Sequence, residues 1–259
     1  MNIVVCVKHV PDAQGERGFS EDNTTDRENV DGLLSELDEY AVEEALKIVE
    51  SEGGEVTALT VGPADAAEAV KKALQMGADK GIHISDDAIA GSDALATSLV
   101  IAEAVKKVGQ PDIVMFGLAS TDGGMSVIPA MVAERLGLPQ LTQVSTLEVS
   151  GAQATGRRDS DVASETVVAS LPAVVSVTDQ INEPRYPSFK GIMAAKKKPV
   201  EEMSLADLGV DAGQVGLDAA ATKVLDTTKR PPREQGQIVT DEGEGGTKLV
   251  EFLSGAKLI

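Results

Sequence analysis

A polar segment with adjacent glycines follows a short apolar stretch of the sequence. Residues 112–116 read Asp-Ile-Val-Met-Phe, and Gly117 to Ser126 read Gly-Leu-Ala-Ser-Thr-Asp-Gly-Gly-Met-Ser. Gly123 and Gly124 would let the backbone approach a ligand closely, and the hydroxyls and carboxylate beside them supply oxygens. The segment could hold a nucleotide phosphate. It matches neither G-x-G-x-x-G nor the P-loop pattern, so an ordinary strand-to-helix turn is the alternative.

A second loop that could contact a ligand follows the first apolar run, at Val7-Lys8-His9-Val10. Residues in patterns typical of catalysis are absent from the sequence: it has no CxxC, no HExxH and no nucleophile elbow. His9 and His83 lie far apart without a carboxylate pattern, which is typical of surface or strand-end histidines. Cys6, the one cysteine, lies in an apolar run and indicates a buried thiol in a reducing compartment. We therefore expect no catalytic and no metal site.

The elements that would position these loops alternate between strand and helix. Apolar, β-branched runs predict strands at 2–8, 56–61, 81–84 and 112–116, and helical patterns start after Ser35–Asp38 and cover 64–76, 92–108 and 127–136. This alternation predicts an α/β fold with a doubly wound, mostly parallel sheet. In such a sheet ligands bind at the carboxyl ends of the strands, where helix amino termini favour anions.

The second half of the sequence departs from this alternation. The runs 143–149, 153–157, 166–170 and 173–177 have no helical period between them, which predicts antiparallel strands or completion of the sheet edge. Residues 13–32 are polar and are expected to form an excursion. We expect an α/β domain over 1–222 and an extended C-terminal arm over 223–259 that packs on a partner or on the domain itself.

The composition limits the classes of partner. A formal net charge of −19 argues against general binding to nucleic acid or anionic membrane, which both present phosphate. No stretch approaches the roughly 18 apolar residues of a membrane span, and the start lacks the pattern of a cleaved leader. We expect a protein of the cytoplasm that is not embedded in a membrane.

A proline-containing segment near residue 190 is a candidate protein contact. Asn182-Glu-Pro-Arg-Tyr-Pro-Ser-Phe-Lys-Gly-Ile-Met193 predicts an extended loop, in which Phe189 is either an exposed anchor for a partner or packed beneath the loop. The lysines at 196–198 predict a solvated helix start or a small cationic rim.

Six segments resemble one known family in their order along the chain. They are Val7-Lys8, Ala41-Val-Glu-Glu-Ala45, Ala73-Leu-Gln-Met-Gly-Ala-Asp-Lys-Gly-Ile-His83, Leu171-Pro-Ala-Val-Val175, Asn182-Glu-Pro-Arg-Tyr186 and Ile192-Met-Ala-Ala-Lys-Lys-Lys198. They resemble the β subunit of electron transfer flavoprotein over about 210 residues. The resemblance implies a Rossmann-like, adenine-nucleotide-binding domain in a heterodimer, with FAD held mainly by the α subunit and a structural AMP held by the β subunit.

The resemblance also implies particular site residues. Those expected at AMP are Cys6, Ser35, Glu36, Leu37, Asp38, Val61, Gly117, Leu118, Ala119, Ser120, Thr121, Asp122, Gly123, Gly124, Met125, Ser126, Val127 and Ile128. Those expected to dock partner dehydrogenases are Arg185, Tyr186, Pro187, Ser188, Phe189, Lys190, Gly191, Ile192, Met193 and Ala194, with Phe189 where leucine is familiar. Asp159 stands where a glutamate can position the flavin-bearing domain. Ala13 and Leu37 stand where aromatic side chains can approach the flavin.

The implied role is that of an electron carrier subunit rather than an enzyme. Acyl-CoA and related dehydrogenases, as in fatty acid β-oxidation, would donate electrons through the α-held flavin to a quinone oxidoreductase. Two alternatives belong to other classes: a stand-alone ATP-hydrolysing or ligase-like enzyme, and a stress-type nucleotide-binding homodimer. The first would need a glycine-rich loop after the first strand, where no glycine occurs before Gly15. Relatives that bifurcate electrons hold a second FAD in place of AMP, and AMP is the expectation here.

Overall fold

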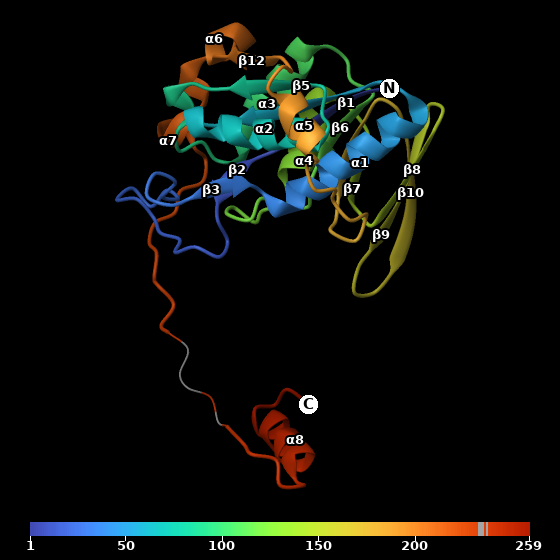
Figure 1. The fold of residues 1–259 in the computed structure, drawn as a ribbon. Coiled ribbons are helices and arrows are strands. Elements are labelled where there is room, and N and C mark those ends of the chain that lie inside the picture. Colours follow the sequence, from blue (N-terminus) through green and yellow to red (C-terminus); the bar gives the residue numbers. More distant parts are fainter. Residues whose placement is uncertain (233–235, 237) are drawn as a thin grey trace. The chain divides into compact units, whose positions relative to one another are not determined.

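The computed structural model describes residues 1–232, 236 and 238–259. The chain divides into two compact units, Met1–Leu225 and Asp226–Ile259. The first unit contains a seven-stranded sheet in the order β12-β5-β4-β1-β6-β11-β7 (Figure 1). Its strands are β1 (Asn2–Cys6), β4 (Glu55–Val61), β5 (Lys80–Ile84), β6 (Ile113–Phe116), β7 (Gln140–Val144), β11 (Ala173–Val177) and β12 (Val200–Met203). Every adjacent pair in it is parallel, which confirms the predicted doubly wound α/β class.

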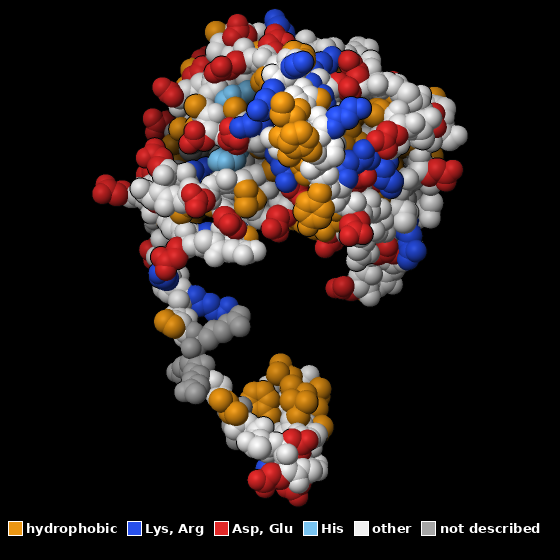
Figure 2. Space-filling model, viewed as in Figure 1, with side chains coloured by type: hydrophobic (Ala, Val, Ile, Leu, Met, Phe, Trp, Pro, Cys, Tyr) orange, Lys and Arg blue, Asp and Glu red, His pale blue; other side chains and the backbone are white. Residues whose placement is uncertain are grey.

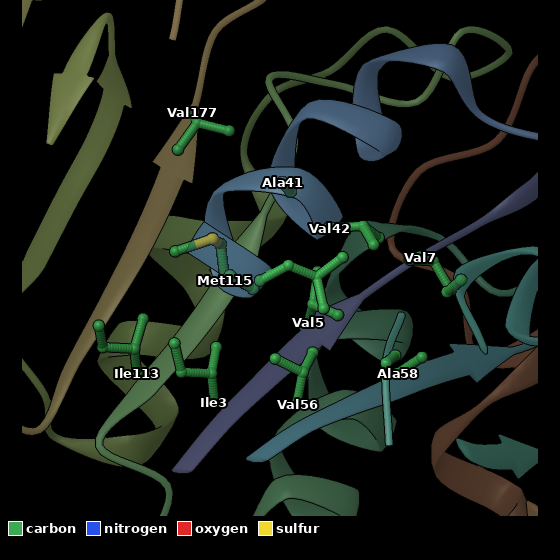
Figure 3. Close-up of a cluster of buried hydrophobic side chains, with 14 of the residues drawn as sticks. Ile3, Val5, Val7, Ala41, Val42, Val56, Ala58, Ile113, Met115 and Val177 are labelled. Carbon is green, nitrogen blue, oxygen red and sulfur yellow. The ribbon is translucent and has the colours of Figure 1, made fainter. Parts of the chain in front are cut away.

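Helices cover both faces of this sheet. They are α1 (Glu36–Glu52), α2 (Ala67–Met76), α3 (Ala94–Val108) and α4 (Ile128–Leu136). Successive side chains of a strand point to opposite faces, so Ile3 and Val5 pack with α1 and α2 while Val4 and Cys6 pack with α3 and α4. Figure 3 shows the first cluster, where β1, β4 and β6 meet Ala41 and Val42 of α1. Burial on both faces explains why these strands are continuous apolar runs.

A small antiparallel sheet connects β7 to β11. It consists of β8 (Thr146–Ser150), β9 (Gln153–Asp159) and β10 (Ser164–Ser170), in the order β10-β9-β8. The expected strand at 143–149 is wrong as a single element, because the chain leaves the large sheet at Val144 and enters the small one at Thr146. Both alternatives for this region hold in part, since β8 to β10 are antiparallel while β11 and β7 complete one side of the parallel sheet, with β7 at its edge.

The first predicted strand ends earlier than expected, at Cys6. A short antiparallel pair follows, formed by β2 (His9–Pro11) and β3 (Gly32–Leu34). Residues 12–31 between them contain one isolated bridge, Phe19 to Thr25, and otherwise form turns and irregular structure, as the polar composition indicates.

The segment predicted as an extended loop near residue 190 contains a helix, α5 (Phe189–Ala195). The Oγ of Ser188 caps it by accepting a hydrogen bond from the Gly191 N–H at 3.0 Å. The lysines at 196–198 follow this helix, so a helix start was the wrong expectation. Lys198 instead donates from Nζ to the carbonyls of Leu74, Gly77 and Ala78 at the end of α2, at 2.6–3.1 Å. It therefore satisfies carbonyls that a helix end leaves free.

Short helices complete the first unit: α6 (Leu205–Leu208), α7 (Gly216–Ala219) and 3₁₀ turns at Ala64–Ala66, Asp87–Ile89 and Ala212–Gln214. The second unit contains α8 (Gly245–Gly255), on which Leu249, Val250 and Phe252 are exposed. Residues 233–235 and 237 of the predicted arm lie outside the described residues. Within the part of the chain that the structure describes, no helix is long and apolar enough to cross a membrane.

Candidate functional site

Three strands that carry predicted ligand residues are neighbours in the sheet. β1 lies between β4 and β6, and Cys6 at the end of β1 is opposite Leu59, two residues before Val61. The start of α1 is joined to the same edge, because the Ser35 N–H donates to the Lys8 carbonyl at 2.9 Å. The structure thus brings the first-strand exit, residues 35–38, and the loop after β6 to one edge of the sheet. This is the edge at which parallel sheets bind ligands.

Gly117 fixes the approach of the β6 loop to α1. A Cβ at this position would lie 2.5 Å from the Leu37 carbonyl oxygen and 2.6 Å from Asp38 Oδ1. Both distances are shorter than van der Waals contact allows, so only glycine permits this close crossing of the two backbones. The close contact therefore fixes where the loop begins, and residues 118–128 that follow are partly or fully exposed to solvent.

The side chain of Asp122 joins the two loops that the sequence singled out. Its Oδ1 accepts from Lys8 Nζ at 2.9 Å, and its Oδ2 pairs with Arg27. Burial alone would raise the pKa of Asp122, whose side chain is 1% exposed, but Lys8 and then Arg27 hold that pKa well below its usual range. The cluster carries one net positive charge, from two cations and one carboxylate.

Beyond Asp122 the loop presents backbone donors. Among the described residues, no partner accepts from the N–H groups of Met125, Ser126 and Val127, which lead into α4. Positive φ angles of 60° at Gly124 and 56° at Ser126 turn this stretch of backbone. Free N–H groups at a helix start, beside a net positive cluster, can bind a phosphate. The buried Oγ of Ser35 also has no partner in the described chain.

Asp38 is a buried carboxyl between the two loops. Its Oδ2 accepts from the Lys8 N–H at 2.9 Å, and the Gly117 backbone lies beside the same carboxyl. Burial raises the pKa of Asp38 to about 7, because it outweighs this hydrogen bond and the attraction of Lys8. Burial, with Asp38 adding to it, also raises the pKa of the Cys6 thiol far above its usual range. Cys6 is therefore an unreactive structural thiol at neutral pH.

The raised pKa of Asp38 predicts a particular pH dependence of stability. Between its ordinary pKa of 3.8 and about 7, the folded state keeps a proton that the unfolded state has lost. The contribution of this group to the free energy of unfolding is therefore full at low pH. It falls by at most about 1.4 kcal/mol per pH unit as the pH rises through this window, and it does not change further above the window. We expect Asp38→Asn to gain stability relative to the wild type across the same window. Urea unfolding at a series of pH values measures the difference, and parallel pH profiles would contradict it.

The predicted docking residues lie elsewhere, over α1 and α2. Arg185 is held on α1 by a bidentate pair with Glu43, at 2.7 and 3.0 Å, and by Glu50. The carbonyl of Gln75 in α2 lies where a Cβ on Gly191 would come within 2.5 Å, so α5 sits directly against α2. The segment is therefore fixed to the sheet-covering helices.

Apolar side chains on this segment face solvent. Tyr186 is 94% and Phe189 81% exposed, and Ile192 and Met193 are also exposed; these four residues are called the α5 patch. Figure 2 shows hydrophobic atoms gathered over α5 with basic side chains beside them. An exposed apolar cluster with a charged border is typical of a protein contact. The structure thus places Phe189 on the surface and not beneath the loop.

Asp159 lies in a third place, at the end of β9 in the small sheet. Its carboxylate accepts from Ser145 Oγ at 2.6 Å, from Ser164 Oγ at 2.5 Å and from Arg157 Nε at 2.9 Å. The hydrogen bonds from Ser145 and Ser164 lower the pKa of Asp159. The preceding residue, Arg158, forms an ion pair with Glu165 on β10.

Comparison with known proteins assigns the chain to a family. The family described as "Electron transfer flavoprotein domain" matches residues 22–208. An electron transfer flavoprotein subunit beta of Mycobacterium leprae is 50% identical over 100% of this chain and 99% of its own length. This chain belongs to the electron transfer flavoprotein β-subunit family. It is accordingly an electron carrier subunit rather than an enzyme.

More distant relatives cover nearly the whole chain as well. The electron transfer flavoprotein subunit beta of Thermoanaerobacterium thermosaccharolyticum is 36% identical over 100% of both chains. The caffeyl-CoA reductase-Etf complex subunit CarD of Acetobacterium woodii is 34% identical over 93% of this chain and 92% of its own. The likeness therefore extends through the first unit and into the second.

Reasoning from the sequence missed two arginines at the carboxyl edge of the sheet in this electron transfer flavoprotein β-family chain. Arg27 pairs with Asp122, and Arg17 Nη1 donates to the Thr121 carbonyl at 2.7 Å. Both come from residues 12–31, where no periodicity signals a contact about 100 residues away. Ala13, expected near a flavin, lies exposed on the same segment, and Leu37 is half-buried at the start of α1.

Two hollows of the surface lie at the opposite edge of the sheet. They measure about 230 and 180 Å³, and both are lined by Lys80 and Val108, beside the amino ends of the strands. They coincide with none of the predicted site residues. Residues 1–232, 236 and 238–259 contain no group of three or more His, Cys, Asp or Glu placed to hold a metal ion.

Proposed function

We propose that this chain is the β subunit of a heterodimeric electron transfer flavoprotein and holds AMP at the edge formed by β1, β4 and β6. The observation that carries the proposal is the loop of residues 117–128, whose free N–H groups lie beyond the net positive Lys8–Asp122–Arg27 cluster. The α subunit would hold FAD, and the heterodimer would work in the cytoplasm, where acyl-CoA and related dehydrogenases of fatty acid β-oxidation supply electrons.

The residues at this edge fit an adenylate. The N–H groups of Met125, Ser126 and Val127 would bind the phosphate, with the dipole of α4 and the positive cluster favouring its charge. Cys6, Ser35 to Asp38 and Val61 would surround the nucleoside, and Ser35 offers a hydroxyl that has no partner in the described chain. AMP is preferred to a second FAD because the resemblance is closest to dehydrogenase-linked members of the family.

The chain itself would make and break no bond during electron transfer. FAD on the α subunit supplies the redox chemistry. This chain would dock a primary dehydrogenase through Arg185 to Ala194, with Phe189 filling a pocket on the partner. A quinone oxidoreductase would then receive the electrons.

Asp159 is proposed to help position the flavin-bearing domain by pairing with an arginine of the α subunit. Its carboxylate already accepts from Ser145, Ser164 and Arg157. A partner arginine would therefore have to join or replace the pair with Arg157.

Nucleotide analysis of the purified complex tests the main proposal. The chain is co-expressed with its α partner, purified through a tag on this subunit, and its nucleotides are extracted and identified. We expect a yellow heterodimer that releases about one AMP and one FAD, in keeping with one adenylate site on this chain. Release of two FAD would identify a second flavin in place of AMP. A colourless homodimer that hydrolyses ATP would overturn the assignment.

Truncation of the exposed aromatic tests docking. We expect Phe189→Ala to slow reduction by an acyl-CoA dehydrogenase by on the order of tenfold, because aromatic anchors dominate such contacts. Flavin content and thermal stability should not change, since the ring is 81% exposed. Leu95→Ala, an exposed apolar truncation on α3 at the other face of the sheet, is the matched control. Wild-type kinetics in Phe189→Ala would remove the docking role.

A further inference from the structure

Residues 12–31 form a long surface segment, here called the strap, between β2 and β3. Its ends are held by the antiparallel pair of these strands and by the Asp12 N–H, which donates to the Asp31 carbonyl at 2.9 Å. Every residue of the strap is at least partly accessible, and even Phe19 is 55% exposed. The strap therefore has no buried apolar side chain to anchor it, and polar contacts must hold it in place.

The two shortest of those polar contacts lead to the loop after β6. Arg17 donates to the Thr121 carbonyl at 2.7 Å, and Arg27 pairs with the carboxylate of Asp122. The blue ribbon of the strap accordingly runs beside the green loop after β6 in Figure 1. Arg17 and Arg27 are the only basic residues in the strap, and both contact this loop.

Asp122 is the point where three segments meet. One carboxylate oxygen accepts from Lys8 Nζ at 2.9 Å and from the Gly123 N–H at 2.6 Å, and the other pairs with Arg27. Its side chain is 1% exposed, whereas Arg27 is 37% exposed. A buried, ionised carboxylate keeps its partners strongly, and the guanidinium can still leave towards solvent. The pair can thus open from the strap side without disturbing the sheet.

We propose that the strap closes over the nucleotide site and that Arg27 and Asp122 are positioning residues that latch it, so that bound nucleotide leaves only when this ion pair opens. The inference rests on the proposed function, because it concerns the same adenylate. It adds two properties that the phosphate-binding N–H groups alone do not give: the release rate depends on the contact that Arg27 of the strap makes with Asp122, and it depends on ionic strength.

The salt dependence is expected because the strap is held by polar contacts alone. With no apolar burial, the free energy of opening is set by the hydrogen bonds of Arg17 and Arg27, by the long contact of 3.5 Å from Asn23 Nδ2 to the Leu225 carbonyl, and by the short β2–β3 ladder. Salt screens the partly exposed guanidinium, since the Debye length falls from about 8 Å at 0.15 M to about 3 Å at 1 M ionic strength. The nucleotide should therefore leave faster at high salt.

The test measures nucleotide release from the complete heterodimer. The complex is loaded with radiolabelled AMP, excess unlabelled AMP is added, and retained label is followed with time. We expect Arg27→Gln to release AMP on the order of tenfold faster than the wild type, which corresponds to about 1.4 kcal/mol, and Arg27→Lys to lie between them. Lys71→Gln, which removes an exposed cation paired with Glu68 on α2, should leave the rate unchanged.

Ionic strength provides a second readout that a merely structural role would not change. Release from the wild type should quicken between 0.05 and 1 M salt, about the range over which screening becomes complete, and release from Arg27→Gln should be much less salt-dependent. This measurement on the wild type keeps the test decisive if a variant folds poorly.

The outcomes separate the latch from the proposed function. A wild-type complex that contains no adenine nucleotide overturns both. A complex that contains AMP but releases it at the same rate in the wild type and Arg27→Gln, with no salt dependence in either, overturns the latch alone. Faster, salt-insensitive release from the variant with salt-dependent release from the wild type supports the latch.

Discussion

Gly117→Ala is expected to destabilise the protein by about 2 kcal/mol or more and to empty the proposed nucleotide site. The added Cβ would lie within 2.6 Å of the Leu37 carbonyl oxygen and of Asp38 Oδ1. These atoms belong to the start of α1, so relief of the clash must move backbone, which costs more than rotation of a side chain. The same movement would displace residues 118–128, which carry the N–H groups proposed to bind the phosphate. Urea unfolding measures the stability, and nucleotide extraction from the purified heterodimer measures the site.

Gly18→Ala is the matched control for this substitution. A Cβ at Gly18 has no heavy atom within 4 Å, and its φ lies outside the left-handed region. We expect wild-type stability and wild-type AMP content for it. Should Gly117→Ala unfold at the wild-type urea concentration and retain its full AMP, the close crossing of the β6 loop and α1 would not be what forms the site.

Arg185→Met is the second substitution for which we expect a large loss of stability. Arg185 is the partner of Glu43, whose side chain is 9% exposed and which accepts from the Arg185 backbone N–H as well as from Nε and Nη2. Glu50, and then Glu43, raise the pKa of Arg185 far above its usual range. Methionine would leave the Glu43 carboxylate buried without its cation. We expect a loss of about 2 kcal/mol, below the 3–5 kcal/mol typical of a fully buried pair because Arg185 is 34% exposed.

The same substitution should also alter the proposed docking surface. Arg185 precedes the α5 patch and ties its segment to α1, so loss of the pair would loosen Tyr186 and Phe189 without removing them. We therefore expect slower reduction by an acyl-CoA dehydrogenase together with the lower stability. Arg158→Met, which breaks the exposed pair with Glu165 on the small sheet, should change stability by less than about 0.5 kcal/mol. Equal losses in the two variants would show that burial of Glu43 does not decide the effect.

Local sequence patterns predicted the parallel core and the loop after β6. Ile113 to Phe116 is a short continuous apolar run because both faces of β6 are covered, and the change to Gly117 and polar residues marks the end of the strand. The order of apolar runs and helical periods then sufficed for the fold class. These features depend on residues that are close in sequence.

Two of the elements that were missed, β12 and α5, have weak or one-sided signals. In β12 only Met203 is buried, as expected for a strand at the sheet edge. α5 has seven residues and contains Gly191, which lowers helix propensity, and the capping Ser188 was the one signal that could have found it. The antiparallel strands of the small sheet were predicted from their apolar runs, although the strands are mostly exposed, and only the break between β7 and β8 at Ser145 was missed.

Contacts between distant segments could not be predicted in the same way. Lys198 is one of three consecutive lysines, and nothing in that run distinguishes the one that meets three carbonyls of α2 and its exit. Arg27 lies in a polar segment 95 residues from Asp122. Such pairs are set by the tertiary fold, which places the strap beside the β6 loop, and not by any local period.

The composition of α8 bears on how the protein must be produced. Leu249, Val250 and Phe252, with Leu258 and Ile259 just beyond the helix, expose apolar side chains at the end of the chain. A polypeptide released from the ribosome with this terminus uncovered should adhere to itself or recruit chaperones. We therefore expect the yield of soluble β subunit to depend on how much α subunit is co-expressed rather than on the strength of the promoter of the β subunit.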